Sequence, residues 1–348
     1  MRNETRDKWD EYLSTQARLN SLPLERVSKQ FTVVPSVAQT LEDKIQHSSD
    51  FLKRINVNLV PEQEGQRIGI GVSGPIASRN TSTTVRREPN SPETIEDNGK
   101  YRCEQTNSDT YISYARLDAW AGKRDFKTRV TNQIITRRAL DRIMIGFNGT
   151  SVAAKSDITA NPLLQDVNIG WLKKYRLFAP QRVMSDVMVS TRDEDNKLIT
   201  KGQYGNLDSL AFDAVNSLID PWYQDDTGLI VICGRKLLAD KYFPVLNTVS
   251  GSNPNTEALA GQMLVSQKQI GGMQTYRAPF FPADALFITT FDNLAIYVQE
   301  GTHRRTLKEE PEFNRVTTYE SDNEAYCVED YGFGCLIEGI KAGEPIEP

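Results

Sequence analysis

The sequence predicts an α+β fold, in which helices and strands occupy different stretches of the chain. Apolar residues recur every three or four positions in several segments of the first two-thirds, as in amphipathic helices. The last hundred residues instead contain short alternating runs of β-branched and aromatic residues, which favour strands. A very polar segment, residues 78–100, separates two strand-like stretches. These features indicate a mixed fold with at least one long excursion from its core.

Length, charge and hydropathy exclude several classes of protein. A chain of 348 residues predicts about two domains. The 41 basic and 46 acidic residues give a net charge of −5, which argues against a general nucleic-acid binder. The longest apolar run, residues 229–233, is far shorter than the ~20 residues of a spanning helix. The N-terminus also lacks the apolar stretch of a secretory signal, and four scattered cysteines fit a reducing compartment.

Two helices are expected near the N-terminus. Residues 4–20 carry apolar side chains at four-residue spacing, from Trp9 to Ala17, and this pattern predicts an amphipathic helix. Pro23 and the polar residues after it separate that helix from the rest of the chain. A surface helix and a detachable arm therefore both remain open. An approximate apolar face predicts a second helix over residues 36–55.

The polar segment 78–100 is the most informative feature outside the motifs. Alternating apolar residues predict a strand before it, at 68–72, and another after it, at 111–114. Within it only Val85 and Ile95 are apolar, so it cannot bury enough surface to offset its ordering entropy. Loops of this length are usually functional or disordered. The sequence therefore predicts a long protruding hairpin with a mobile tip.

The longest helical pattern follows, over residues 117–147. Gly146 and Gly149, on either side of Phe147, mark its end. Eight basic and three acidic residues lie between Arg116 and Arg142, so we expect a basic solvent-facing side. A solvated face is the favoured interpretation, and a face for an acidic partner or nucleic acid is the alternative.

The remaining elements are predicted from short patterns. We expect helices at 161–176 and 207–219, and a buried strand at 229–233 followed by a short helix that ends at Pro244. Polar insertions lie at 186–205 and 247–261. Strands are expected near 285–290, 294–299, 314–320 and 324–330, with Ser321-Asp322-Asn323 as the turn between the last two.

Each short motif has a structural interpretation that is stronger than its chemical one. Gly69-Ile70-Gly71-Val72-Ser73-Gly74 matches a dinucleotide-binding pattern, but Pro75 follows where that site needs a helix. A flexible strand end is therefore favoured. The acidic runs Asp193-Glu194-Asp195 and Asp225-Asp226 are expected to be solvated. His303-Arg304-Arg305 could bind phosphate, but a salt-bridge cluster is favoured.

No group of residues supports catalysis. The chain has only two histidines, His47 and His303, which weakens any histidine-based metal site or triad. Trp171 and Trp222 are expected to anchor a core or an interface. Gly332, Gly334 and Gly339 are expected to allow turns or close packing. We therefore expect no enzyme, no catalytic residue, no cofactor and no metal site.

Taken in order along the chain, the residues resemble the major capsid proteins of Peduoviridae-type tailed phages. The resemblance covers nearly the whole chain. The stretches that carry it are Phe31-Thr32-Val33, Pro35-Ser36-Val37, Ser48-Ser49-Asp50-Phe51-Leu52, Gly146-Phe147-Asn148-Gly149, Asn161-Pro162-Leu163-Leu164-Gln165-Asp166-Val167, Gly170-Trp171-Leu172, Pro221-Trp222-Tyr223-Gln224, Leu237-Leu238-Ala239-Asp240-Lys241-Tyr242-Phe243-Pro244, Phe281-Pro282-Ala283-Asp284-Ala285, His303-Arg304-Arg305, Val328-Glu329-Asp330-Tyr331 and Gly334-Cys335-Leu336.

The resemblance implies the fold of tailed-phage shell proteins and of the herpesvirus capsid floor. That fold has an N-terminal arm, an extended hairpin called the E-loop, a peripheral domain with a long spine helix, and an axial domain. It also implies that a protease removes an N-terminal segment, with the junction near Phe31 and Thr32. The implied ranges are 1–31 for the removed segment, 32–63 for the arm, 64–116 for the E-loop, 117–207 for the peripheral domain with the spine helix, 208–292 for the axial domain, and 293–348 for the returning peripheral strands and the C-terminus.

The implied function is that of a structural major capsid protein. Copies would form the pentamers and hexamers of an icosahedral phage head that encloses double-stranded DNA without sequence-specific binding. The implied partners are further copies, a scaffolding protein, a maturation protease and a portal, with no membrane. The protein would reside in the virion, and in the host cytoplasm before assembly. An encapsulin-like, non-viral container of similar fold is the alternative.

Overall fold

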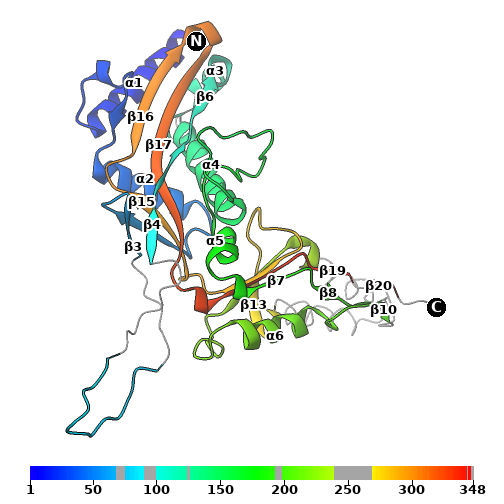
Figure 1. The fold of residues 1–348 in the computed structure, drawn as a ribbon. Coiled ribbons are helices and arrows are strands. Elements are labelled where there is room, and N and C mark those ends of the chain that lie inside the picture. The colour runs from blue at the N-terminus through cyan, green and yellow to red at the C-terminus, as the bar shows by residue number, and fades with distance from the viewer. Residues whose placement is uncertain are drawn as a thin grey trace, which may run out of the picture.

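The computed structural model describes residues 1–67, 75–89, 99–123, 126–192, 198–238, 269–342 and 344–345. Helices and strands are both abundant there, which confirms the α+β class. Two sheets organise the molecule. The first lies with most of the helices in the upper half of Figure 1, and the second lies below it and to the right.

The first sheet is built around one very long strand. It contains β1 (Phe31–Thr32), β16 (Arg304–Glu310), β17 (Arg315–Val328), β15 (Leu294–Gln299) and β2 (Asn56–Val60), in that order. Two further strands, β5 (Glu104–Asn107) and β6 (Thr110–Ser113), also pair with β17. All of these pairs are antiparallel except that of β15 with β2.

The centre of β17 differs from what the sequence predicts. The turn expected at residues 321–323 is wrong, because β17 runs unbroken through 14 residues. The turn before β17 lies instead at Pro311–Phe313 and Asn314, whose φ of 52° is left-handed. Strand β16 was not predicted, because Leu307 is its only large apolar residue.

The second sheet is apolar on both faces. Its order is β12 (Gln269–Ile270), β13 (Met273–Tyr276), β11 (Ile230–Cys233), β14 (Leu286–Thr289), β18 (Cys335–Glu338) and β7 (Val183–Ser185). Every residue of β11 and β14 is buried, which explains why their sequences are uniformly hydrophobic. The expected strand at 229–233 and the strand near 285–290 are therefore confirmed.

Short strands occupy the first expected polar insertion, 186–205. They are β8 (Met188–Val189), β9 (Thr191–Arg192) and β10 (Leu198–Lys201). Strand β8 pairs with β19 (Lys341–Ala342), while β10 pairs with β9 and with β20 (Glu344–Pro345).

Most of the described helices were expected, but their ends differ from the predicted ends. The structure has α1 (Asn3–Leu19), α2 (Pro35–His47), α3 (Tyr114–Ala121), α4 (Phe126–Asn148), α5 (Trp171–Phe178) and α6 (Leu207–Leu218). The expected helix 36–55 is too long, because α2 ends at His47 and β2 begins at Asn56. The expected helix 117–147 is two helices, since α3 ends before Gly122. The expected helix 161–176 begins only at Trp171.

The main core lies between the two sheets and against α4 and α5. It includes Phe51, Phe147, Trp171 and Tyr326, whose rings contact one another in chains of edge-on and tilted pairs. Gly146 lets α4 approach α5 closely, because a Cβ at that position would collide with the Trp171 ring. A second core lies between α6 and the other face of the second sheet.

The polar excursion leaves the first sheet through a paired base. Strands β3 (Glu64–Gln66) and β4 (Lys100–Arg102) are antiparallel, so the chain departs and returns at one place. Residues 75–89 extend away from the body at the lower left of Figure 1. The expected strand at 68–72, the glycine motif 69–74, the acidic run 193–195 and the insertion 247–261 lie outside the described residues.

Candidate functional site: a buried ionic network and the exposed excursion

Three acidic side chains of β17 form one half of a buried ionic network. Glu320, Asp322 and Glu324 alternate along the strand and therefore share one face of the sheet. They are 3%, 2% and 3% exposed. Burying carboxylates in this way is unfavourable unless each of them is paired, so their partners must lie directly opposite.

Two arginines of α4 supply those partners. Arg138 and Arg142 are one turn apart and therefore project from the same side of the helix. Arg138 bonds Asp322 and lies 3.2 Å from Glu320, while Arg142 lies 2.7 Å from Glu324. Arg142 also lies 2.6 Å from Glu42 of α2. The network thus fastens both α4 and α2 to the centre of β17.

The residues around β16 extend the network to the sheet edge and to α1. Arg305 lies 2.7 Å from Glu320, and it donates a hydrogen bond to Gln16 of α1 at 3.1 Å. His303 Nδ1 lies 2.9 Å from Asp322. The motif 303–305 therefore contributes a salt-bridge cluster, as the favoured interpretation predicted.

The electrostatics of the network favour the charged forms. Burial by itself would raise the pKa of the Asp322 carboxyl, but Arg138 and His303 hold that pKa well below its usual range. Burial also opposes the charge on Arg142, yet Glu324 and Glu42 raise its pKa. The pKa of Tyr326 is raised by burial and by Glu324 beside it. Such a network is intolerant of losing one member, because its former partner stays buried and unpaired.

The expectation of a basic, solvent-facing spine helix is wrong for two of its arginines. Arg138 and Arg142 are only 4% and 3% exposed, so neither is available to nucleic acid or to an acidic partner. Arg137 is exposed and pairs with Asp141 one turn along the helix, at 2.6 Å. The signal that could have revealed the buried pair was the alternation of acids at 320, 322 and 324.

Phe31 and Thr32, the expected junction for processing, lie on the outermost strand of the first sheet. Phe31 pairs with Arg305 and Thr32 with Arg304. Phe31 is 9% exposed, whereas Thr32 is exposed. The segment before them is folded, because Trp9 and Tyr12 of α1 are buried in a cluster with Leu117, Leu307 and Val316.

The remaining candidates behave as structural residues. Trp171 and Tyr175 are fully buried, whereas Trp222 is 47% exposed and therefore not part of a core. A Cβ at Gly332 would collide with Asp220, and Gly339 has a φ of 65°, which confirms close packing and a turn. Among the described residues, no helix is long and apolar enough to cross a membrane.

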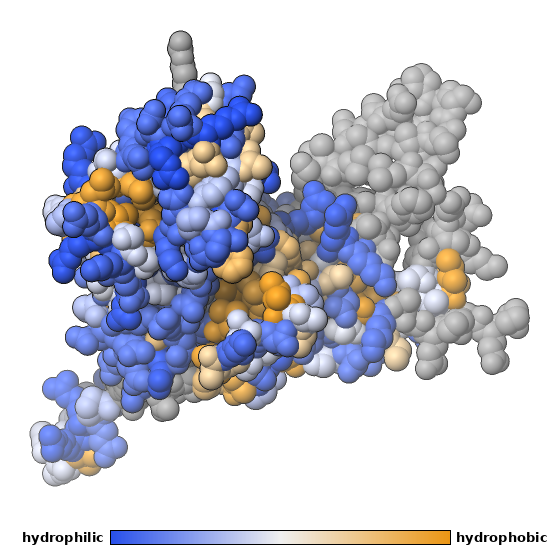
Figure 2. All heavy atoms as spheres, turned by 90° about the horizontal axis from the view of Figure 1, so that it is seen from above, coloured by the Kyte–Doolittle hydropathy of each residue, from blue (hydrophilic) through white to orange (hydrophobic). Residues whose placement is uncertain are grey.

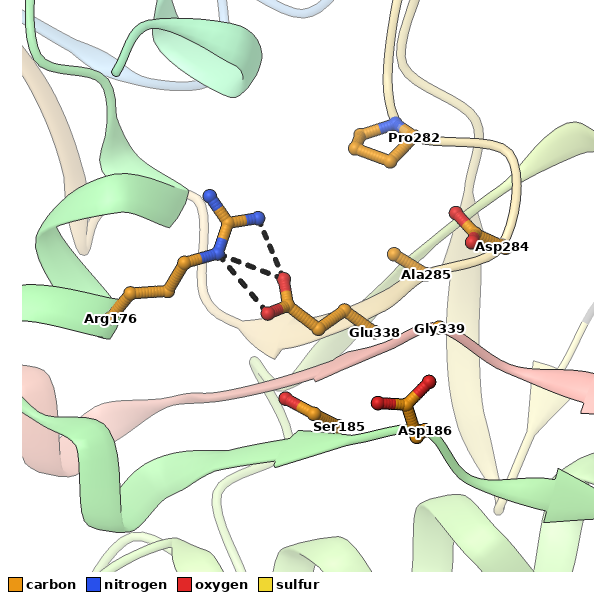
Figure 3. A pocket seen from close by; sticks show the side chains of 8 residues that line it. All are labelled: Arg176, Ser185, Asp186, Pro282, Asp284, Ala285, Glu338 and Gly339. Carbon is orange, nitrogen blue, oxygen red and sulfur yellow. Dashed lines mark hydrogen bonds and ion pairs between the residues drawn. The ribbon is translucent and has the colours of Figure 1, made fainter. Parts of the chain in front are cut away.

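An open pocket of about 370 Å³ lies where α5 meets the second sheet (Figure 3). Its Arg176 and Glu338 form a two-pronged ion pair at 2.6 and 2.9 Å. Its Asp186 is bonded by Lys341 at 2.8 Å. Because these charges are already paired with each other, the pocket presents structural ion pairs instead of a poised acid or base.

The excursion is almost entirely exposed. Asn80 is half-buried, and all the other residues of 75–89 are exposed. Ile76 and Val85 are 59% and 63% exposed. Figure 2 shows that hydrophobic residues elsewhere are gathered in a few patches on a mainly hydrophilic surface.

Comparison with known proteins identifies the family. A sequence model of the P2 family of phage major capsid proteins matches residues 8–340. The chain is 50% identical to a protein of Escherichia phage P2 described as "Capsid proteins", over 99% of this chain and 96% of that one. It is 49% identical to the major capsid protein of Serratia phage KSP20, over 99% of both chains.

The fold agrees with that result. A chain of the satellite phage P4 procapsid, solved with its size determination protein, has 47% sequence identity and a TM-score of 0.77. The match covers 99% of both chains. The implied capsid fold is therefore confirmed, and with it the expectation of a shell protein found in the virion. The chain belongs to the P2 family of phage major capsid proteins.

Proposed function

We propose that copies of this protein form the pentamers and hexamers of an icosahedral phage head around double-stranded DNA. The observation that carries the proposal is the exposed excursion 75–89, whose base is fixed while its length contacts solvent. Exposed apolar side chains such as Ile76 and Val85 on a polar loop favour contact with another molecule. The family membership favours a further copy, and it favours a viral shell over a non-viral container.

The excursion fits the role of the E-loop, residues 64–116. Its hydrogen bonds are local: Asn80 accepts from Ser82 and donates to Val85 within the loop itself. Its base is held by β3 with β4 and by β5 with β17. A loop with a fixed base and few contacts of its own can lie over a neighbour at little cost to its own subunit.

We assign the other parts of the chain to the remaining regions of the capsid fold. We assign residues 32–63 to the arm, 117–207 and 293–348 to the peripheral domain, and 208–292 to the axial domain. The ionic network supports a rigid peripheral domain, since it joins α4 to β17, and it ties α2 of the arm to that domain. The separate core under α6 supports an axial domain with its own interior.

Processing near Phe31 and Thr32 is supported by their position at a sheet edge. An edge strand can be peeled away without breaking the sheet behind it, and β1 pairs only with β16 among the described strands. Cleavage there would release residues 1–31, including α1. The protease, a scaffolding protein and a portal are the partners that we propose. Assembly would begin in the host cytoplasm.

Co-expression with the scaffolding protein, followed by electron microscopy, tests shell formation. We expect closed shells from the full chain and soluble protein without stable shells after deletion of residues 80–98. Normal shells from the deletion would refute the role of the excursion. Failure of the full chain to form shells under every scaffold condition would count against the proposed assembly.

Mass spectrometry of mature particles tests processing separately. We expect a chain that begins near Thr32. A full-length chain in mature, DNA-filled particles would refute removal of the segment without affecting the proposal of a shell.

A further inference from the structure

Three potential metal ligands from three different elements converge inside the ionic network. They are Glu42 of α2, His303 just before β16, and Asp322 of β17. One ligand atom from each lies within 4.8 Å of the other two. Their side chains are 7%, 6% and 2% exposed, so the group is shielded from bulk water.

Two of these side chains carry a buried polar atom that no hydrogen bond satisfies. In the part of the chain that the structure describes, Glu42 Oε1 and His303 Nε2 have no hydrogen-bond partner. Asp322 Oδ1 lies 2.9 Å from His303 Nδ1, so the two side chains face one another directly. Buried polar atoms are rarely left unsatisfied, and two of them in one place indicate a missing partner.

The second oxygens of the two carboxylates are firmly held. Arg142 lies 2.6 Å from Glu42 Oε2, and Arg138 bonds Asp322 Oδ2. His303 Nε2 lies 3.7 Å from Glu320, too far for a hydrogen bond. Outer partners such as these two arginines orient the carboxylate ligands of metal sites.

The charge balance of the network also favours an additional cation. The network contains four carboxylates, on Glu42, Glu320, Asp322 and Glu324, against three guanidinium groups, on Arg138, Arg142 and Arg305. The carboxylates therefore outnumber the guanidinium groups by one. The guanidinium of Arg138 stays 4.0 Å from Glu42 Oε1, too far for a hydrogen bond.

We propose that Glu42, His303 and Asp322 bind a divalent transition-metal ion, for which zinc is the best-suited probe. Zinc accepts imidazole nitrogen together with carboxylate oxygen, whereas calcium and magnesium prefer oxygen ligands throughout. The ion would tie α2 directly to β17. This site replaces the expectation that the chain has no metal site, and it does not depend on the proposed shell function.

Calorimetric titration of the full-length, chelator-treated protein with zinc chloride tests the site. We expect one zinc ion per chain and a higher unfolding temperature, with little effect of magnesium. His303→Gln should weaken binding by more than about 100-fold, since it removes a direct ligand. His47→Gln is the matched control, because His47 is the only other histidine and is exposed, and it should bind zinc normally.

Circular dichroism of each metal-free variant shows whether that variant is folded. If His303→Gln does not fold, Glu42→Gln is the second ligand variant. Absence of stoichiometric zinc binding to the wild type would overturn the proposal. Equal zinc affinity in the wild type and in a folded ligand variant would overturn it too. If the stability of the protein changed with pH in a way that requires His303 but did not change with zinc, a proton would supply the missing positive charge. That result would also overturn the proposed metal site.

Discussion

Two polar stretches that look alike in the sequence have opposite environments in the molecule. Residues 320–324 read Glu-Ser-Asp-Asn-Glu, a pattern that predicts a turn at 321–323. They lie in the centre of β17, with three carboxylates buried against α4. Residues 75–89 are similarly polar and almost entirely exposed. Polarity alone therefore does not distinguish a buried region from an exposed one.

The difference lies in the availability of partners within the chain. Each buried acid of β17 meets a guanidinium from α4 or β16 at hydrogen-bonding distance. The hydrogen bonds of the excursion, in contrast, connect neighbouring positions of one loop. The first region is held by its own subunit. The second has only local hydrogen bonds, and we propose that contacts from another copy complete it.

The largest predicted effect concerns the network. Arg142→Met should lower the free energy of unfolding by about 3–5 kcal/mol, because Glu42 and Glu324 would remain buried without their partner. Urea unfolding of the free subunit measures this change. Arg137→Met on the same helix is the control, since its exposed pair with Asp141 should be worth less than about 1 kcal/mol. Equal losses from both variants would contradict the contrast between buried and exposed pairs.

A smaller effect is expected from acid. The folded pKa of Asp322 lies below its value of about 3.9 in an unfolded chain. Its contribution to stability is therefore complete above about pH 5 and is lost as the pH falls through 3.9 toward the folded pKa. Urea midpoints measured between pH 7 and pH 3 should fall more steeply for the wild type than for Asp322→Asn. Parallel curves would show that the carboxylate is not held in its charged form.

The smallest effect on subunit stability is expected in the excursion. Replacing Ile76 and Val85 together by serine should change the free energy of unfolding by less than about 0.5 kcal/mol, because both side chains are already exposed. The same variant should reduce the yield of shells, measured by sedimentation after co-expression with the scaffolding protein. Thr83→Ser in the same loop is the control. An unchanged shell yield would remove these two side chains from the proposed contact.

The sequence predicted the fold best where hydrophobic pattern and environment agree. The helix at α1, the buried strand β11 and the amphipathic α6 all follow from the spacing of their apolar residues. The structure departs from expectation where charge is buried, as in β16 and at Asp322. The alternation of acids at 320, 322 and 324 indicates a shared face, but the burial of Asp322 depends on Arg138, which lies 184 residues away in the chain.

The ends of the helices were also predicted poorly from the sequence. The periodicity over 117–147 continues through Gly122, whereas α3 ends at Ala121 and α4 begins at Phe126. The candidate metal ligands were equally hidden. Glu42, His303 and Asp322 lie far apart in the sequence and meet because β16 pairs with β17 and the arginines of α4 bring α2 to the same place.

Hydrogen–deuterium exchange of residues 75–89, measured in the free subunit and in assembled shells, tests the central claim most directly. The account predicts rapid exchange in the free subunit and strong protection in shells, while the amides of β17 are protected in both. Rapid exchange of residues 75–89 in closed shells would contradict the claim that a neighbouring copy completes this surface.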